Sequence, residues 1–465
     1  MTETPPYQVT DPFTGQVTQT FPYAGDAEIE AALASSAAAF EAWRARPVAE
    51  RAAIVKRVGV LFAERAAELG ALVTSEMGKR PSSASGEAAY CSTIFEYFAD
   101  QGPTLLADHP LPGHDGARIE HLPIGPLLGV MPWNYPYSQV ARFAAPNLVA
   151  GNTIVVKHAE NCPTSALAIA ELMRDAGVPD GVYLNLFATH GQVATMIADP
   201  RVRGISLTGS ERAGAAVAEA AGRHLKKVVL ELGGSDPYIV LDTDDVVAAA
   251  ELAWATRTAN VGQACNSNKR MIVMADIYDD FVAILVKQAS AMTPRTPGDD
   301  SDTAYSPMVS RRAAESLLAQ VQDAVAKGAT LHIGGELVSD DGAYFAPAVL
   351  TGVTPKMRAY HEELFGPVAV VYKVSSDDEA VRLANAVDFG LGGAVWSTDE
   401  QRATKVASQL ELGMAAVNTP AVWGPDLPFG GIKRSGFGRE LGPLGILEFV
   451  NKRLFYVQPN RTGSD

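Results

Sequence analysis

One of the three cysteines of this chain lies in a short polar stretch, VGQACNSNKR, at residues 261–270. A cysteine with no further role usually sits among apolar neighbours as a small hydrophobe. Cys265 instead has polar neighbours, and Lys269 and Arg270 follow it closely. Nearby positive charge favours the thiolate, which is the nucleophilic form of cysteine. The stretch alone fits both a reactive and an inert thiol, so other segments have to supply the remaining groups of a site.

Two further segments have residue types suited to holding a nucleotide. In SLTGSERAG, Gly209 lets the backbone approach a phosphate, and Ser210 can cap a helix whose N-terminus faces it. In VVKHAEN, Lys157 and Glu160 stand at the carboxyl end of a strand, where ligands bind in parallel sheets. Lys157 can donate to ribose or phosphate, whereas Glu160 can accept from ribose hydroxyls and would repel an additional phosphate. Taken singly, each segment fits an ordinary helix cap or a solvated loop end better.

The elements that must position these segments alternate between short β-rich runs and helices. Residues 27–78 carry apolar side chains at helical spacing. Strands and helices then alternate over residues 153–232 and again over residues 237–419. Such alternation predicts βαβ units and mostly parallel sheets with helices on both faces. The Cys265 loop falls between the first helix and the following strand of the second alternation.

The bulk composition excludes several kinds of partner. The 465 residues carry a formal net charge of −15, so we expect no nucleic acid and no membrane as partner. No apolar run is long enough to cross a bilayer, and the polar start lacks a secretory signal. The three cysteines are far apart and odd in number, which argues against a disulfide framework and predicts a cytoplasmic protein. The eight histidines show no metal-ligand spacing, so we predict no metal site.

Five segments, in their order and separations, resemble the NAD(P)-dependent aldehyde dehydrogenase superfamily. They are MPWNYP, LELGGSDP, GQAC, EELFGPV and LPFGGIKRSGFGRELG, and they extend over nearly the whole chain. The resemblance is strongest to the short bacterial succinate-semialdehyde dehydrogenases, in which the phrase KHA replaces the KPS of most members. It implies that the chain is an enzyme that oxidises an aldehyde to a carboxylic acid with NAD(P)⁺.

The resemblance also implies a covalent mechanism. Cys265 would attack the aldehyde carbonyl as a thiolate. The side-chain amide of Asn134 and the backbone N–H of Cys265 would stabilise the oxyanion, where losing one donor typically costs ~10²–10³ in rate. After hydride transfer, Glu231 would be the general base that lets water cleave the thioester. Taken singly, Asn134 also fits a turn residue, Glu231 a strand-end carboxylate and Cys265 an inert thiol.

By the same resemblance, Lys157 and Glu160 would hold the adenine ribose. Because Glu160 would repel the additional phosphate of NADP, NAD is the expected cofactor, and NADP is not excluded. The remaining implied cofactor residues lie near the pyrophosphate, the nicotinamide ribose or the nicotinamide, and are Pro132, Trp133, Gly209, Ser210, Glu363 and Phe365.

The expected substrate is succinate semialdehyde. In semialdehyde dehydrogenases an arginine eight residues beyond the oxyanion asparagine binds the distal carboxylate, and here that residue is Arg142, whose planar fork matches a carboxylate. A helix-face ion pair is the equally weighted alternative for Arg142. Three departures weaken the assignment: Ser138 replaces a bulky aromatic residue, Asp426 stands where a basic residue is expected, and residues 266–268 are polar. Trp423 and Asp426 fit a cationic aminoaldehyde instead, and aromatic or aliphatic aldehydes stay open.

The predicted fold is therefore α/β, with two doubly wound domains and a small β-rich oligomerisation arm. We expect the β-rich segments 117–125 and 449–457 to form an arm that pairs with another subunit, giving a homodimer or homotetramer. The expected boundaries are 1–111 and 127–230 for a Rossmann-like cofactor-binding domain, 231–445 for the catalytic domain, and 112–126 and 446–465 for the arm.

Two hypotheses compete with this one. The chain can be a non-catalytic relative that keeps the fold as a binding or structural protein, but such relatives would lose Cys265, Asn134 or Glu231, and all three are present. It can also be a CoA-acylating dehydrogenase, a mechanism that dispenses with the hydrolytic base. The presence of Glu231 favours water as the acceptor.

Overall fold

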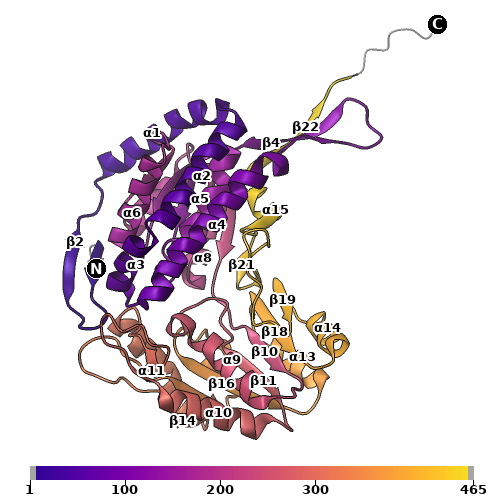
Figure 1. Cartoon of the computed structure of the whole chain (residues 1–465). Coiled ribbons are helices and arrows are strands. Elements are labelled where there is room, and N and C mark those ends of the chain that lie inside the picture. The colour runs from indigo at the N-terminus through magenta and orange to yellow at the C-terminus, as the bar shows by residue number, and fades with distance from the viewer. Residues whose placement is uncertain (1–6, 459–465) are drawn as a thin grey trace.

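The structure is a computed structural model that describes residues 7–458. The first residues of the predicted cofactor-binding domain, 1–6, and the last of the predicted arm, 459–465, lie outside the described residues. Two mostly parallel sheets, each covered by helices on both faces, lie one above the other, and an antiparallel arm projects from the upper one (Figure 1). The predicted fold class of two doubly wound α/β units is confirmed. The predicted domain boundaries stay a prediction.

The first sheet has six strands. Its strands are β5 (Pro126–Val130), β6 (Thr153–Lys157), β7 (Tyr183–Asn185), β8 (Gly204–Thr208), β9 (Lys227–Glu231) and β21 (Gly436–Phe437). β6 to β9 are the strands of the predicted first alternation, whereas the parallel strand β5 precedes it and was not predicted. Their order is β21-β9-β8-β5-β6-β7. Because the chain moves from β5 to β6 on one side and returns to β8 on the other, β5 stands at the switch point of the sheet, where such folds bind ligands.

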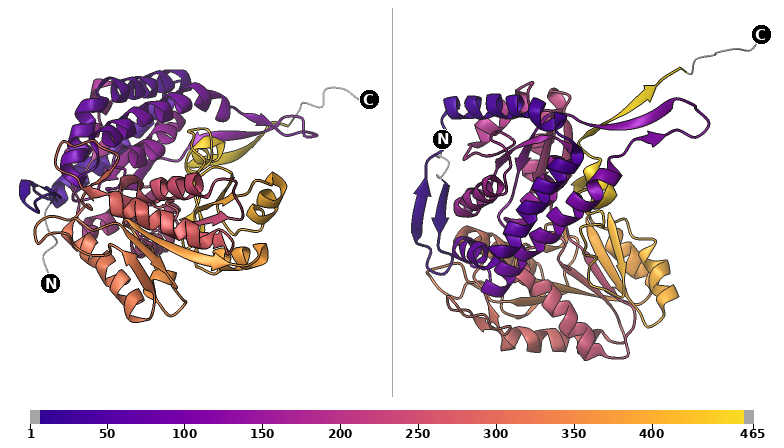
Figure 2. Two further views of the ribbon diagram at one scale, coloured as in Figure 1. Left: turned by 60° about the horizontal axis from the view of Figure 1, so that its bottom comes forward. Right: turned by 45° about the horizontal axis from the view of Figure 1, so that its top comes forward.

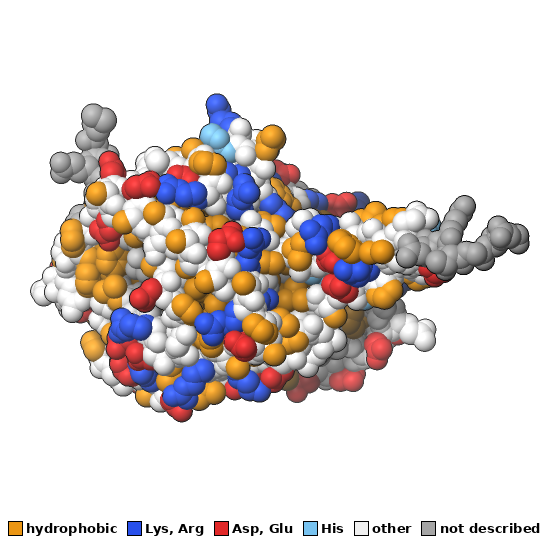
Figure 3. Space-filling view, turned by 90° about the horizontal axis from the view of Figure 1, so that it is seen from above, with side chains coloured by type: hydrophobic (Ala, Val, Ile, Leu, Met, Phe, Trp, Pro, Cys, Tyr) orange, Lys and Arg blue, Asp and Glu red, His pale blue; other side chains and the backbone are white. Residues whose placement is uncertain are grey.

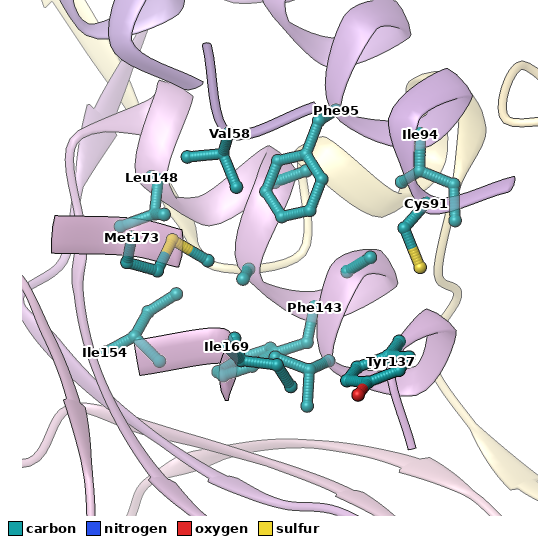
Figure 4. Packing of buried hydrophobic residues seen from close by; sticks show 14 of the residues in the cluster. Val58, Cys91, Ile94, Phe95, Tyr137, Phe143, Leu148, Ile154, Ile169 and Met173 are labelled. Carbon is teal, nitrogen blue, oxygen red and sulfur yellow. The ribbon is translucent and has the colours of Figure 1, made fainter. Parts of the chain in front are cut away.

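Helices cover both faces of this sheet because its strands alternate their side chains. Ile154 and Val156 face a core shared with α2, α4, α5 and α6, whereas Val155 faces a core shared with α1, α7 and α8. Figure 4 shows Tyr137 and Phe143 inside the first of these cores. The helices are α1 (Asp26–Ala45), α2 (Val48–Glu64), α3 (Ala66–Met77), α4 (Pro81–Leu105), α5 (Ser138–Ala150), α6 (Pro163–Asp175), α7 (His190–Ala198) and α8 (Glu211–Arg223).

The helical prediction for residues 27–78 is correct in type, but the segment forms three helices. The first break lies at Pro47, because the residue before a proline is pushed into an extended conformation, and Arg46 has φ −69° and ψ 136°. The second break lies at Arg65, with φ −106° and ψ 17°.

The second sheet repeats the arrangement with seven strands in the order β14-β15-β16-β11-β10-β18-β19. Ile239 and Ile272 face a core with α11, α13 and α14, and Tyr238 and Met271 face a core with α9 and α10. The strands are β10 (Pro237–Val240), β11 (Arg270–Met274), β14 (Thr330–Ile333), β15 (Ala348–Thr351), β16 (Val368–Val374), β18 (Gly392–Trp396) and β19 (Met414–Val417). The helices are α9 (Val246–Thr258), α10 (Tyr278–Ala291), α11 (Arg311–Ala326), α13 (Asp377–Asn385) and α14 (Glu400–Ala407).

The arm is a three-stranded antiparallel sheet that leaves the body of the molecule in both views of Figure 2. It consists of β3 (His109–Pro110), β4 (Ala117–Pro123) and β22 (Val450–Tyr456). The two predicted β-rich segments thus pair with each other, from Val450 opposite Pro123 to Tyr456 opposite Ala117. β22 remains an edge strand, with exposed Leu454. Pairing of this edge with another subunit stays a prediction.

Short elements complete the described chain. They are β1 (Tyr7–Thr10), β2 (Val17–Phe21), η1 (Ala259–Gly262), β12 (Thr293–Pro294), β13 (Ala304–Tyr305), α12 (Arg358–His361), β17 (Phe389–Gly390), β20 (Ile432–Lys433) and α15 (Gly442–Ile446). Within residues 7–458, no helix has the length and apolar character needed to cross a bilayer. The same residues contain no cluster of three or more His, Cys, Asp or Glu side chains suited to a metal ion. On the face seen in Figure 3, acidic and basic side chains are intermixed.

Candidate active site

The predicted catalytic residues lie where loops of the two sheets meet. Asn134 is on the loop between β5 and α5, Glu231 is the last residue of β9, and Cys265 follows η1 and precedes β11. A cavity of about 750 Å³ opens at this place, and Cys265, Ser138 and Arg142 line it. Two of the three predicted substrate residues therefore share one cavity with the predicted nucleophile.

The backbone before Cys265 turns sharply. Asn260 and Val261 have left-handed φ values of 50° and 56°, and Gly262 has φ 70°. A left-handed conformation is rare for a β-branched residue and costs of order 1–3 kcal/mol, which the surroundings have to offset. At Gly262 a Cβ would lie 2.3 Å from the carbonyl oxygen of Gly366. The GQAC motif begins with glycine because the cysteine loop passes directly against the EELFGPV segment.

A buried arginine ties these two segments together. Arg257 donates to the carbonyl of Leu364 at 2.7 Å and to the hydroxyl of Ser267 at 3.0 Å. Asn268 donates to a backbone carbonyl of α9 at 2.9 Å. Ser267 and Asn268, two of the departures from the family pattern, are therefore buried structural residues, and Asn266 is the one that lines the cavity.

Burial controls the electrostatics of the nucleophile. It raises the pKa of Cys265 to about 12, although the charges of Arg142 and Lys269 act in the opposite direction. Lys269 is itself buried, donates to two backbone carbonyls of the cysteine loop at 2.7 Å and lies 3.0 Å from Glu363 Oε1. Arg270 donates instead to backbone carbonyls at the end of α13. The expectation that adjacent charge favours a thiolate is outweighed in this structure, so the thiol needs a base or a change in its surroundings.

Asn134 is held against the turn that carries Cys265. Its side-chain Nδ2 donates to the carbonyl of Gln263 at 3.1 Å. Its backbone carbonyl accepts from Lys79 Nζ and from Asn260 Nδ2, both at 3.0 Å. A primary amide has two N–H donors, so one donor of Asn134 is available beside the cysteine loop.

Glu231 does not line the cavity but lies in a buried acidic pair with Glu440. The two residues are 2% and 4% exposed. Among the described residues neither oxygen of Glu231 has a hydrogen-bond partner, whereas Arg142 and Ser206 interact with the carboxyl group of Glu440. Burial raises the pKa of both groups, the charge of Glu440 raises the pKa of Glu231 further, and Arg142 lowers both. A Cβ at Gly430 would lie 2.5 Å from Glu231 Oε1, so the PFGG motif leaves room beside this carboxyl group. Buried ionisable groups with perturbed pKa values are frequent at functional sites.

Arg142 connects this acidic pair to the cavity. Its Nε lies 2.9 Å from Glu440 Oε2, and its Nη2 donates to the side-chain oxygen of Gln139. The guanidinium lies 4.2 Å from the centre of the Phe429 ring. Arg142 therefore lines the cavity and forms an ion pair, and its binding of a distal carboxylate stays a prediction.

The mouth of the cavity is mostly apolar. Trp423, which is 62% exposed, lines it together with Leu427 and Leu444. Asp426 lies close by but is exposed and does not line the cavity, whereas Ser138 does. The structure therefore separates Asp426 from the other two predicted substrate residues.

The predicted nicotinamide residues come together beside the cysteine loop. The rings of Trp133 and Phe365 meet edge to face, with centroids 5.7 Å apart, and Pro132 precedes Trp133 on the same loop. Glu363 Oε1 accepts from the backbone N–H of Gly234 at 3.1 Å. A carboxylate and two aromatic faces next to the nucleophile fit a ribose and a nicotinamide ring.

The predicted adenosine and pyrophosphate residues lie at or just after the carboxyl ends of β6 and β8, the two strands that flank β5. Lys157 ends β6, and its Nζ lies 2.5 Å from Glu160 Oε1. Ser210 caps α8 as predicted, since its Oγ accepts from the N–H of Ala213 at 3.3 Å. A Cβ at Gly209 would find just one atom within 4 Å, at 3.7 Å, so the backbone is open for a phosphate to approach. These residues fit a dinucleotide at the switch point of the first sheet.

The sequence prediction missed three residues that contact the site. Glu440 belongs to the closing LPFGGIKRSGFGRELG segment, in which the sequence assigns no residue a role, and it pairs with Arg142. Lys79 and Glu87 lie in and after the MGK turn, far from every quoted motif, and contact the Asn134 loop. The acidic type of Glu440 and its place beside a glycine-rich motif could have identified it from the sequence. No sequence feature distinguishes Lys79 or Glu87 in this way.

The fold and the site define a member of the aldehyde dehydrogenase family. The model of the aldehyde dehydrogenase family matches residues 1–454, and the chain belongs to this family. It is 53% identical to a succinate-semialdehyde dehydrogenase [NADP(+)] of Deinococcus radiodurans, over 98% of this chain and 96% of that protein. Among solved structures it resembles Gox0499, at 43% identity and TM-score 0.95 over 98% of this chain and all of that one. It also resembles a succinic semialdehyde dehydrogenase of Streptococcus pyogenes in complex with NADP⁺, at 39% identity and TM-score 0.94 over 97% and 99% of the two chains.

Proposed function

We propose that this protein oxidises succinate semialdehyde to succinate with a nicotinamide dinucleotide. The observation that carries the proposal is that Cys265 and Arg142 line one cavity. Asn134 lies against the same loop, 3.1 Å from the carbonyl of Gln263. The names of the Deinococcus radiodurans and Streptococcus pyogenes relatives support the choice of substrate.

In the proposed reaction the Cys265 sulfur attacks the aldehyde carbon, and its proton passes to a base. The Asn134 amide and the Cys265 backbone N–H donate to the oxyanion of the resulting thiohemiacetal. A bound nicotinamide dinucleotide supplies the hydride acceptor, and loss of the hydride leaves an acyl thioester on Cys265. Glu231 then takes a proton from the water that cleaves the thioester, which releases the acid and restores the thiol.

Glu231 can act as a base only if it is ionised when water attacks. Burial and the neighbouring charge of Glu440 hold its pKa high in the described state. We infer that its carboxyl group gains contact with water during turnover, because hydration lowers the pKa of a buried acid.

Arg142 supports a substrate that carries a distal carboxylate. A guanidinium has five N–H donors in a planar fork. The ion pair with Glu440 and the hydrogen bond to Gln139 use part of that set, so further donors can meet a carboxylate in the cavity.

The proposal is tested by product analysis with and without CoA, using wild type and Cys265→Ala. We expect free succinate in both conditions from wild type and no turnover from the variant, which should still bind the cofactor. Retained activity in Cys265→Ala would overturn the mechanism. Succinyl-CoA as the product would move the protein to the acylating class.

Cofactor choice is a separate proposal. We propose NAD as the preferred cofactor, because Glu160 accepts well from ribose hydroxyls and repels the additional phosphate of NADP. The Deinococcus radiodurans relative is named for NADP(+), and the Streptococcus pyogenes structure contains NADP⁺ as the cofactor. Substitution of Glu160 therefore tests whether this residue shifts the preference to NAD. We expect Glu160→Ser to raise the kcat/KM ratio of NADP to NAD at least ~10-fold, since like-charge contact costs several kcal/mol. An unchanged ratio would show that Glu160 does not select the cofactor.

We also propose a homodimer or homotetramer in the cytoplasm. The arm presents the exposed edge of β22, which suits pairing with a second subunit. Cys91, Cys162 and Cys265 are all free thiols, which fits a reducing compartment. Light scattering of wild type and of a Leu454→Lys variant measures the oligomeric state. We expect the variant to lose assembly.

A further inference from the structure

The loop that carries Asn134 is contacted by a buried ion pair that takes no part in the proposed reaction. Lys79 Nζ lies 2.5 Å from Glu87 Oε2, and the two side chains are 2% and 3% exposed. Lys79 follows α3, and Glu87 lies in the second turn of α4. Burying two charges is costly unless each is paired and hydrogen-bonded on all sides. The other contacts of the pair, with residues 134–138, indicate its role.

Lys79 holds the start of the loop. Its Nζ donates to the backbone carbonyl of Asn134 at 3.0 Å. It also lies 4.0 Å from the centre of the Tyr135 ring, which suits a cation–π contact. The ammonium group therefore has a carboxylate, a carbonyl and an aromatic face as partners, one for each N–H donor.

Glu87 holds the end of the same loop. Its Oε1 accepts from the backbone N–H of Tyr137 at 2.9 Å and from that of Ser138 at 3.1 Å. These N–H groups open α5, where a carboxylate is favoured by the helix dipole. Tyr137 itself is fixed in the core shown in Figure 4, where its hydroxyl donates to the carbonyl of Leu69 at 3.0 Å. The pair thus joins both ends of residues 134–138 to α3 and α4.

We propose that Lys79 and Glu87 are positioning residues that hold the Asn134 amide where the oxyanion of the reaction forms. The proposal rests on the proposed function, in which Asn134 is an oxyanion donor. The reason is that Lys79 donates to the backbone carbonyl of Asn134, the residue whose side-chain amide would donate to the oxyanion. On the other side, Asn260 donates to the same carbonyl from the cysteine loop. The carbonyl of Asn134 is therefore the point at which the pair and the nucleophile's loop are joined.

The expected loss of rate is no larger than that of a ~1 Å shift and smaller than that of a lost oxyanion donor. A misplacement of ~1 Å costs ~10²-fold in rate, and removal of one oxyanion donor costs ~10²–10³-fold. We therefore expect Lys79→Met to lower kcat/KM for the aldehyde about 10–100-fold, with KM for the cofactor unchanged.

A double-mutant cycle separates positioning from general structure. Four proteins are compared: wild type, Lys79→Met, Asn134→Ala and the double variant. If Lys79 acts through the Asn134 amide, its substitution lowers kcat/KM in the wild-type background and has less than about twofold effect in the Asn134→Ala background. An equal loss in both backgrounds, or no loss in either, overturns the proposal. If Asn134→Ala itself costs nothing, the oxyanion role in the proposed function fails as well, and the two failures are thereby distinguished.

Two further measurements guard the result. The alkylation rate of Cys265 by iodoacetamide should be the same in wild type and Lys79→Met, because the nucleophile is not the target, and a loss of alkylation that matches the loss of kcat/KM overturns the proposal. Lys56→Met removes a lysine from an exposed pair with Asp100 on the same helical layer, at 2.8 Å, and should leave kcat/KM within about twofold of wild type. If Lys79→Met does not fold, Lys79→Met/Glu87→Gln removes both charges together and replaces it in the cycle.

Discussion

Two buried ionic clusters flank the cysteine loop, and they differ in how well they are satisfied. In the Lys79–Glu87 pair, the ammonium group contacts the Glu87 carboxylate, the carbonyl of Asn134 and the Tyr135 ring. Each carboxylate oxygen of Glu87 in turn accepts from a donor.

In the Glu231–Glu440 pair, neither oxygen of Glu231 has a hydrogen-bond partner among the described residues, and Arg142 is the close cation of Glu440. A fully satisfied cluster fixes geometry, whereas an unsatisfied one keeps groups that can exchange protons or bind a ligand. The first cluster is therefore suited to positioning and the second to chemistry.

The largest expected effect comes from neutralising the unsatisfied cluster at Glu231. We expect Glu231→Gln to lower kcat ~10²–10⁴-fold, the usual range for losing a general base. Because hydride transfer precedes thioester cleavage, the first turnover should still release about one equivalent of reduced cofactor as a burst, measured by stopped-flow absorbance. Glu76→Gln, at a buried glutamate whose oxygens are hydrogen-bonded to Thr164 and Ser165, is the matched control and should keep kcat within about threefold. A kcat of Glu231→Gln close to that of wild type would show that Glu231 is not the general base.

The next effect concerns the cation of the same cluster. Arg142→Met should lower kcat/KM for succinate semialdehyde ~10²-fold, because the distal carboxylate loses its charge-assisted partner. The kcat/KM for butanal, which lacks the carboxylate, should fall by a clearly smaller factor, which reflects only the charge of Arg142 on Cys265 and Glu231. Arg142→Lys should lie between, since an ammonium group cannot offer the planar fork. Equal losses for both aldehydes would mean that Arg142 only supports the structure through Glu440.

The smallest expected effect is a change in how the free energy of unfolding depends on pH when Glu440 is replaced. Burial raises the pKa of Glu440 above its ordinary 4.5 in the folded protein. A group with a raised pKa binds its proton more tightly when folded, so its contribution to the free energy of unfolding is lost as pH rises from about 4.5 towards the raised value. Glu440→Gln removes this penalty at high pH, by at most ~1.4 kcal/mol per pH unit. The unfolding temperature of the variant relative to wild type should therefore rise between pH 5 and pH 8, and a constant difference across that range would contradict the inference.

The sequence predicted the parts of the fold that depend on local pattern. The alternation over residues 153–232 and 237–419 predicted two parallel sheets, because the side-chain periods of strands and helices differ within each segment. It did not include β5, the strand at the switch point of the first sheet. It also placed Cys265 between a helix and a strand, as found. The three helices within residues 27–78 were not separated, because the apolar spacing continues through Pro47 and Arg65 while the backbone does not.

The motifs predicted which residues belong to the site, but they did not predict which side chains contact each other. Sequence order carries no information on which side chain faces which, so the pairing of Arg142 with Glu440, 298 residues later in the chain, was not foreseeable. Lys269 follows Cys265 closely, but it is bonded to backbone carbonyls and Glu363 rather than to the thiol. Burial, which sets the pKa of Cys265 to about 12, is likewise a property of the assembled fold.

The most direct test of the proposed function is the ratio of kcat/KM for succinate semialdehyde to that for butanal with the wild-type enzyme and NAD. The two aldehydes have the same chain length and differ in the distal carboxylate that Arg142 is proposed to bind. We predict a preference for the semialdehyde of ~10² or more, the size expected for a desolvated guanidinium–carboxylate contact. Equal values, or a preference for butanal, would contradict the proposed substrate, leave the aldehyde dehydrogenase family in place, and direct the search to neutral or cationic aldehydes.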